Sequence, residues 1–171
     1  GFDLVVRRRD ALAQLGSVLT DRYAAIADQP EPVGFLYAPQ MNLESADALR
    51  AKLEASRRRD QVMKSTGNGP HRDDFEFSLH GQPAKEYASE GQQRALVLSL
   101  RLAQAGWFRE RTQVEPVLLA DDVLGELDPA RRERFWSAVP ETNQVIATGT
   151  EHPGDALGVW QVFDVKDGGF A

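Results

Sequence analysis

The sequence predicts an α/β fold: a mostly helical module over residues 1–64, then a lobe with mainly parallel strands over residues 65–171. Two observations predict it. In the second part an apolar run ends at Asp121, a helix begins near Pro129, and another apolar run covers residues 144–148. This order is typical of a strand–helix–strand unit with parallel strands and a right-handed crossover. In the first part, apolar residues recur at steps of three and four, as on one face of a helix.

The first module is predicted to contain two helices and one strand. The spacing of apolar side chains over residues 12–26 indicates an amphipathic helix with one buried stripe. Residues 33–37 form a short apolar run before a proline and indicate a strand. A second helix is predicted over residues 45–60, with Leu49 and Leu53 facing inward and a charged end.

The second lobe is predicted to begin after a turn at residues 67–70. Residues 75–79 alternate between apolar and polar side chains, as a half-buried strand does. Residues 92–110 have apolar side chains on two sides, so this helix is expected to lie in a core. Near the end of the chain, residues 159–165 alternate like an edge strand, and residues 167–169 indicate a closing turn.

Composition narrows the class of protein. A chain of 171 residues can bury a core, and 42% hydrophobic with 27% charged residues is ordinary for a globular protein. The absence of cysteine excludes disulfides and cysteine-ligated zinc. No apolar stretch approaches the length of a membrane span. The sequence therefore predicts a soluble, cytoplasmic protein with no membrane partner.

Charge limits how the chain could meet nucleic acid. The formal net charge of −6 repels phosphate at long range, so any DNA contact must be local. The candidates are the arginines at residues 7–9, 57–59 and 131–132. A solvated helix face is the simpler interpretation for each group.

A possible phosphate-binding helix end lies at Ser89. Ser89 precedes Gln92 by three residues, the spacing of a capping box, so a helix is predicted to begin here. The backbone N–H groups of Glu90, Gly91 and Gln92 would point forward beside the Ser89 hydroxyl. Such a helix end attracts phosphate, although the pattern alone is a common cap.

A pair of adjacent carboxylates lies further along the chain than Ser89. Asp121 and Asp122 end an apolar run, and residues 125–128 read Gly-Glu-Leu-Asp. A buried parallel strand delivers such side chains to its carboxyl edge, where one could hold a metal ion and the other could act as a base. Alone, the pair could be a strand end in any α/β domain. The order and spacing of both motifs together predict half of an ATP site.

The other half of such a site is missing from the sequence. No segment reads G-x-x-x-x-G-K-[ST], the loop that wraps nucleotide phosphates. Residues 67–70, the one glycine-dense candidate, are followed by no Lys-Ser or Lys-Thr and indicate a turn. The chain alone is therefore not expected to complete the site or to be active.

These motifs resemble those of a known group. Residues 89–94 resemble the signature motif of ABC-type ATPases, residues 118–122 resemble Walker B, and residues 125–128 resemble the D-loop. The RecF family of DNA replication and repair proteins is the closer match, because residues 69–77 and the run Asp-Asp-Val-Leu-x-Glu-Leu-Asp are similar to its motifs. The likeness extends from about Leu12 onward. It implies the C-terminal lobe of an ABC-type ATPase head, without the Walker A lobe.

The resemblance implies a head that dimerises head to tail around two ATP molecules. Ser89 and the helix start behind it would bind the γ-phosphate held by the partner's Walker A loop. Asp121 would hold Mg²⁺, and Asp122 would polarise the attacking water. Most ABC ATPases have Glu at the second position, so the shorter Asp implies slow turnover. Asp128 would cross the dimer interface.

The switch region departs from the superfamily pattern. Where a His is usual, the chain has Thr148, Gly149 and Thr150. A threonine hydroxyl can contact a γ-phosphate but carries no positive charge, and His152 is a weaker substitute. The cofactor-binding residues that the resemblance implies are Ser89, Glu90, Gly91, Gln92, Asp128 and Thr150.

The function implied by the resemblance is ATP-gated DNA binding in replication, recombinational repair and the SOS response. The implied partners are gapped duplex DNA or single-strand/double-strand junctions, and the mediator proteins RecO and RecR. The complete protein would be a slow DNA-dependent ATPase associated with the nucleoid. Another ABC-type head is an alternative, but transporters usually have Leu-Ser-Gly-Gly-Gln and a switch His, and no SMC-like heptads are present. A non-hydrolysing interaction module is a further alternative.

A further motif lies just before the predicted strand at residues 75–79. Residues 71–73, His-Arg-Asp, are similar to the protein-kinase catalytic loop, but that loop needs Asn where Ser78 stands. His71 with Asp73 and Asp74 could form a metal cluster. Since no further ligand has a useful spacing, a structural role for Arg72 or a role in lining the nucleotide site is favoured.

Overall fold

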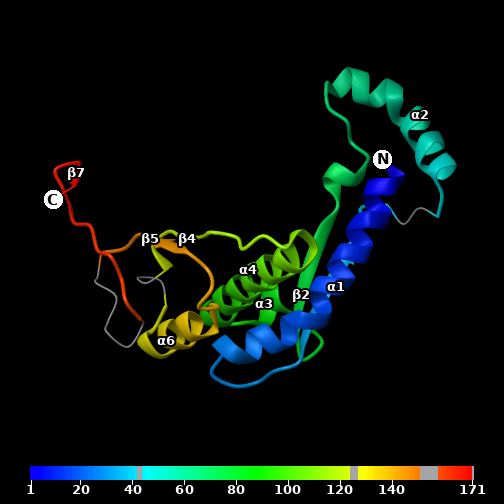
Figure 1. Cartoon of the computed structure of the whole chain (residues 1–171). Coiled ribbons are helices and arrows are strands. Elements are labelled where there is room, and N and C mark those ends of the chain that lie inside the picture. The colour runs from blue at the N-terminus through cyan, green and yellow to red at the C-terminus, as the bar shows by residue number, and fades with distance from the viewer. Residues whose placement is uncertain (42–43, 124–126, 151–157, 171) are drawn as a thin grey trace.

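The computed structural model describes residues 1–41, 44–123, 127–150 and 158–170. In chain order the elements are α1 (Phe2–Ile26), β1 (Val33–Ala38), α2 (Ala46–Met63), the 3-10 helix η1 (Pro70–Arg72), β2 (Asp74–Leu79), β3 (Gln82–Pro83), α3 (Ala84–Tyr87), α4 (Glu90–Thr112), β4 (Leu118–Ala120), α6 (Pro129–Ala138), β5 (Val145–Ala147), β6 (Val165–Lys166) and β7 (Gly169–Phe170). Helix α2 and the hairpin β6–β7 lie at opposite ends of the molecule (Figure 1). The mixed α/β class is confirmed.

The first two helices are longer than predicted. Helix α1 begins at Phe2 instead of residue 12. Helix α2 begins after Ser45, whose hydroxyl accepts a hydrogen bond from the backbone N–H of Ala48 at 3.1 Å, and it continues to Met63. The predicted inward position of Leu49 is confirmed, whereas Leu53 is exposed, since this part of α2 lies at the edge of the molecule.

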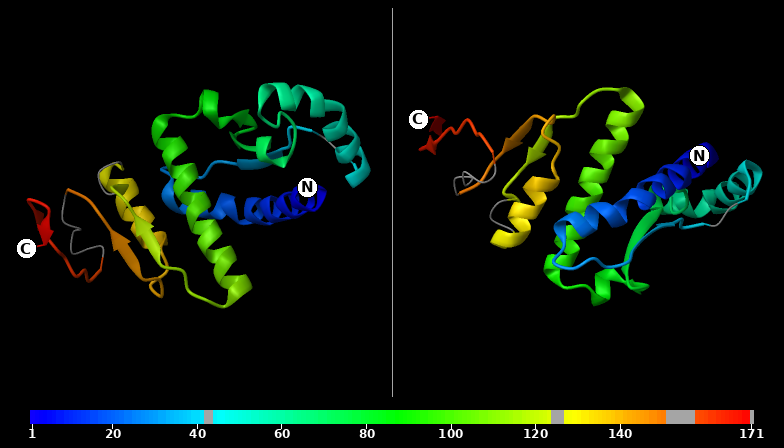
Figure 2. Two further views of the ribbon diagram at one scale, coloured as in Figure 1. Left: turned by 90° about the horizontal axis from the view of Figure 1, so that it is seen from above. Right: turned by 60° about the horizontal axis from the view of Figure 1, so that its bottom comes forward.

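Strand β1 pairs antiparallel with β2, and β2 pairs with the short β3. The side chains of Phe35, Phe75 and Phe77 form an aromatic cluster with ring centroids 5.1 to 5.7 Å apart. Helix α1 packs on β1 and also against α4, which crosses it (Figure 2). Contacts of α1 and β1 thus run across the predicted boundary between residues 64 and 65, and the division into two domains stays a prediction.

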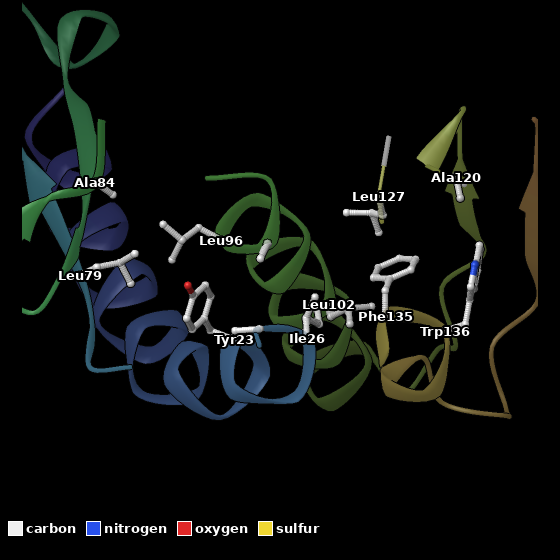
Figure 3. Close-up of a cluster of buried hydrophobic side chains, with 12 residues drawn as sticks. Tyr23, Ile26, Leu79, Ala84, Leu96, Leu102, Ala120, Leu127, Phe135 and Trp136 are labelled. Carbon is white, nitrogen blue, oxygen red and sulfur yellow. The ribbon is translucent and has the colours of Figure 1, made fainter. Parts of the chain in front are cut away.

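Helix α4 lies in the core, as its apolar composition predicts. Leu96 is 1% exposed and packs in one cluster with Tyr23 and Ile26 of α1, with Leu79 of β2 and with Phe135 of α6 (Figure 3). Because the cluster includes side chains from α1, α4, α6, β2 and β4, it fixes the start of α4 relative to the C-terminal elements.

The predicted strand–helix–strand unit is present. Strands β4 and β5 pair in parallel, from Leu118 with Val145 to Ala120 with Ala147, and α6 connects them. One face of this pair is apolar and open to solvent: Leu119 is 77% exposed and its register partner Ile146 is 54% exposed. This is the opposite of the usual burial of parallel sheets on both faces.

The prediction of an edge strand over residues 159–165 is wrong for most of its length. Only Val165 lies in a strand, β6, which pairs with β7 around the predicted turn at residues 167–169. Residues 159–164 have no strand partner in the described part of the chain, and Trp160 packs its ring against Trp136 of α6, at 5.2 Å between centroids. Among the described residues, no helix has the length and apolar character needed to span a bilayer.

Candidate nucleotide half-site

The predicted capping box forms at the start of α4. The Ser89 hydroxyl accepts from the backbone N–H of Gln92 at 3.2 Å, and the Gln92 side-chain oxygen accepts from the backbone N–H of Ser89 at 2.8 Å. Ser89 and Glu90 are exposed, and Gly91 and Gln92 are half-buried. The helix start is therefore ordered and accessible, as a phosphate-binding end must be.

A second layer of hydrogen bonds holds the Gln92 amide, and the sequence did not reveal it. The amide nitrogen of Gln92 donates to both carboxylate oxygens of Glu31, at 3.1 and 3.0 Å. The hydroxyl of Tyr23, which is fully buried, donates to the same carboxylate at 2.9 Å. Burial, and then the bond to Glu31, raise the pKa of Tyr23 well above its ordinary value. Glu31 lies in an irregular segment between two prolines, where no periodicity points to a role.

The acid pair lies directly after β4, and a threonine joins it from β5. The Thr148 hydroxyl donates to the Asp121 carboxylate at 2.5 Å and accepts from the backbone N–H of Asp122 at 3.2 Å. The backbone N–H of Thr148 donates to the carbonyl of Ala120 at 2.9 Å. Because parallel strands end at the same edge, residues far apart in sequence meet here.

Asp122 has an unusual backbone conformation. Its φ of +53° is left-handed, a region that Asp and Asn enter more readily than most residues. Asp121 and Asp122 are both exposed, so their carboxylates are accessible to water and ions. Thr150 is also exposed, whereas Thr148 is the threonine that contacts the acid pair among the described residues. His152, Gly125 and Glu126 lie outside the described residues.

Asp128 begins helix α6. Its carboxylate accepts from the backbone N–H of Arg131 at 3.0 Å and pairs with the Arg131 guanidinium at 3.2 Å. The backbone hydrogen bond from Arg131 is the main cause that lowers the pKa of Asp128. The interpretation of residues 131–132 as a solvated face is wrong for Arg131, whose side chain is 19% exposed because it also pairs with Asp28.

The structure bears on the metal predictions in two ways. Among the described parts of the chain, no group of three or more His or acidic side chains could enclose a metal ion. Asp73, considered as part of such a cluster, has a 4% exposed side chain and accepts hydrogen bonds from the Tyr37 hydroxyl and from the Gln40 backbone N–H. Its role is therefore structural. Asp121 offers an exposed carboxylate of the kind that Mg²⁺ prefers, and further ligands would have to come from elsewhere.

The described residues thus form two groups. The first group is the start of α4, with Ser89, Glu90, Gly91 and Gln92; Glu31 contacts it from the segment before β1, and Arg131 lies against it from α6. Asp121, Asp122 and Thr148 share the edge of the β4–β5 pair. No hydrogen bond or ion pair of the described residues joins Ser89 directly to Asp121 or Asp122.

Replacing Thr148 with valine should lower the free energy of unfolding of this chain by about 1 kcal/mol, because the isosteric side chain loses the hydrogen bonds to Asp121 and Asp122. Chemical denaturation measures this change. Thr150→Val is the matched control and should be close to neutral, since Thr150 is exposed, as Thr148 is, but makes no hydrogen bond within the described residues. Equal losses in the two variants would show that the Thr148 hydroxyl does not tie β5 to the acid pair.

Known proteins are similar to this chain in sequence and in architecture. No protein-family model matches the chain. It is 32% identical to "DNA replication and repair protein RecF" of Streptococcus pneumoniae over 98% of its length and 47% of that protein. It is 36% identical to the RecF protein of Crocosphaera subtropica over 98% of the chain and 47% of that protein, and 37% identical to that of Rippkaea orientalis over 81% and 42%.

Solved structures agree with the sequence relatives. A structure described as the recombination mediator protein RecF with ATPγS in the RecFOR pathway superposes with a TM-score of 0.75 and 26% identity, covering 98% of this chain and 46% of that one. The corresponding structure with ATP gives a TM-score of 0.68 over 87% and 41%. The chain spans less than half the length of these relatives. The chain belongs to the RecF family of DNA replication and repair proteins.

Proposed function

We propose that this chain supplies the signature motif and Walker B of a RecF-type ATPase head, and that two such heads enclose ATP between them. One observation carries the proposal: an accessible, capped helix start at Ser89 occurs in the same fold as an exposed acid pair at the end of a parallel strand. The first is suited to phosphate, and the second to a hydrated metal ion and a water molecule. The ATP and ATPγS named for the solved relatives support this assignment.

In this proposal each residue has a defined task. The Ser89 hydroxyl and the N–H groups at the start of α4 receive the γ-phosphate bound by the partner subunit. Asp121 holds Mg²⁺, which would neutralise phosphate charge when bound, and Thr148 keeps the Asp121 carboxylate oriented. Asp122 orients and deprotonates the attacking water. Glu90, Gly91, Gln92, Asp128 and Thr150 complete the residues proposed to lie near nucleotide or the partner subunit.

The part of the relatives that this chain does not cover would supply the other half of the ATP site. The exposed apolar face of Leu119 and Ile146 supports this, since a parallel pair is normally covered on both faces. We assign residues 1–64 to part of a second domain and residues 65–171 to the C-terminal lobe of the head. Helix α1 and strand β1 join the two parts, because they pack on α4 and β2.

The cellular role follows from the relatives. We propose ATP-gated binding to gapped duplex DNA or to single-strand/double-strand junctions during replication and recombinational repair, with RecO and RecR as partners and the nucleoid as the location. The words "recombination mediator" and "RecFOR pathway" describe the solved relatives and support this role. With a net charge of −6, DNA contact would be confined to local arginine-rich surfaces.

The isolated chain should bind Mg-ATP weakly or not at all, because it has no phosphate-wrapping loop. Calorimetric titration of the 171 residues measures this directly. The full-length protein, with the other half that the relatives have, should bind ATP and hydrolyse it slowly. Micromolar affinity of the isolated chain would contradict the assignment of these residues to half of a site.

A further inference from the structure

The segment between α1 and β1 contacts the start of the signature helix α4 and the helix α6 that follows the D-loop. We infer that Asp28 and Glu31 are positioning residues. They hold the signature helix α4 and the D-loop helix α6 in a fixed relation to α1. The inference rests on the proposed function, because the positioned elements are those proposed to meet the partner's ATP.

Glu31 acts on the signature helix. Its two carboxylate oxygens accept from the Gln92 amide nitrogen, which leaves the Gln92 side-chain oxygen directed at the backbone N–H of Ser89. The Tyr23 hydroxyl donates to the same carboxylate and is itself fully buried in the core. Tyr23 of α1, Glu31, Gln92 and the Ser89 backbone are therefore connected by consecutive hydrogen bonds.

Asp28 acts on the helix that follows the D-loop. One carboxylate oxygen pairs with Arg131 and the other with Arg134, and Arg134 also donates to the carbonyl of Ile26 at 2.9 Å. Both arginines lie on α6, and Arg131 pairs in addition with Asp128. Two guanidinium groups of α6 thus make three polar contacts: two with Asp28, just after α1, and one with Ile26, the last residue of α1.

The two connections meet at Gly91. A Cβ atom at Gly91 would overlap the guanidinium of Arg131, so the missing side chain allows Arg131 to lie against the first turn of α4. A cavity of about 280 Å³ opens here, lined by Asp28, Glu31, Ser89, Gln92 and Arg131 among others. One short segment and one arginine therefore hold the start of α4 against α6.

Electrostatics favours a positioning role over a ligand-binding role for Asp28 and Glu31. A carboxylate near a helix start that receives phosphate opposes the anion, so Glu31 and Asp28 are poor choices for contacting ATP. The Glu31 side chain is 20% exposed, and its partners among the described residues are the Gln92 amide, the Tyr23 hydroxyl and, at 3.7 Å, the His80 ring. The positions of these two carboxylates are explained by the hydrogen bonds that they accept, and not by an attraction to nucleotide.

The first test uses this chain. Glu31→Ala should accelerate backbone hydrogen exchange at Ser89 and Gln92 on the order of 10-fold, because the Gln92 side chain loses its orientation. Exchange in the middle of α4 should remain at the parent rate. Asp21→Ala, which removes the same charge from an exposed position on α1, is the matched control and should leave Ser89 and Gln92 unchanged. Uniformly faster exchange throughout the chain would show a general structural role and overturn the inference.

The second test uses the full-length protein. Asp28→Ala and Glu31→Ala should each weaken Mg-ATP-dependent dimerisation on the order of 10-fold, while the affinity of the monomer for a fluorescent ATP analogue stays at the parent value. Glu31→Gln, which keeps one acceptor for the Gln92 amide, should be intermediate. Sedimentation measures the dimer, and thermal unfolding identifies variants that are merely unfolded.

The outcomes are distinguishable. A parent protein that does not dimerise with ATP would overturn the proposed function, and this inference with it. A parent that dimerises, with folded Asp28→Ala and Glu31→Ala variants that dimerise equally well, would overturn only the positioning role. Weakened dimerisation with unchanged monomer affinity, together with locally faster exchange at Ser89, supports it.

Discussion

Replacing Asp122 with asparagine in the full-length protein should slow ATP hydrolysis on the order of 10²-fold or more, the scale at which loss of a general base is felt. The ATP-bound dimer should then accumulate, because the nucleotide is not consumed. Asparagine is a suitable replacement here. It has the size of aspartate and tolerates the left-handed φ of +53° at this position, so the fold should be retained. Single-turnover phosphate release measures the rate.

Asp121→Asn is the matched comparison for this experiment. Asp121 immediately precedes Asp122, and the substitution makes the same chemical change. It should instead raise the Mg²⁺ concentration needed for ATP-dependent dimerisation, since a metal ligand is weakened. Asp122→Asn should leave that Mg²⁺ dependence unchanged. Hydrolysis at the parent rate in Asp122→Asn would assign the base to another residue, with Glu126 as the next candidate in the sequence.

The second large effect is expected at Ser89. Ser89→Arg in the full-length protein should abolish ATP-induced dimerisation and leave the ATP affinity of the monomer nearly unchanged. A bulky cation at the exposed start of α4 blocks the approach of the partner's nucleotide and opposes the helix dipole, but it does not touch nucleotide on its own subunit. Sedimentation with a non-hydrolysable analogue reports the dimer, and fluorescent nucleotide binding reports the monomer site.

The structure offers a close control for the loss of the helix cap. Ser45 begins α2 as Ser89 begins α4, with its hydroxyl accepting from the backbone N–H three residues later. Ser45→Arg should lower the free energy of unfolding by about 1 kcal/mol, as loss of a serine cap does, without affecting dimerisation. A Ser89→Arg protein that still dimerises would reduce Ser89 to a cap. One that is folded but loses ATP affinity would place the whole site within one subunit.

The elements of the fold were largely predictable because their signals are local. Ser89 with Gln92, and Pro129 after Asp128, mark helix starts by side-chain chemistry that acts within three residues, and both starts are confirmed. The alternation over residues 159–165 failed for a physical reason. A strand needs a pairing partner, and residues 159–164 have none among the described strands. The ring of Trp160 packs against Trp136 of helix α6.

The site was predictable in its motifs and not in its connections. The positions of Ser89, Asp121 and Asp122 follow from the sequence because each lies at the end of a helix or strand. The partners Glu31 and Thr148 are brought to them by tertiary packing over long sequence separations. Such contacts depend on how α1 crosses α4 and on which strands pair. The assigned roles of these residues in binding ATP and Mg²⁺ stay predictions.

The open face of the β4–β5 pair affects any solution study of the isolated chain. Leu119 and Ile146 form an apolar patch beside strand edges that carry free backbone groups within the described residues. Such surfaces associate with one another at high concentration, without nucleotide and with little sensitivity to salt. A self-associated species of this chain would therefore have to be separated from an ATP-dependent dimer by its indifference to ATP.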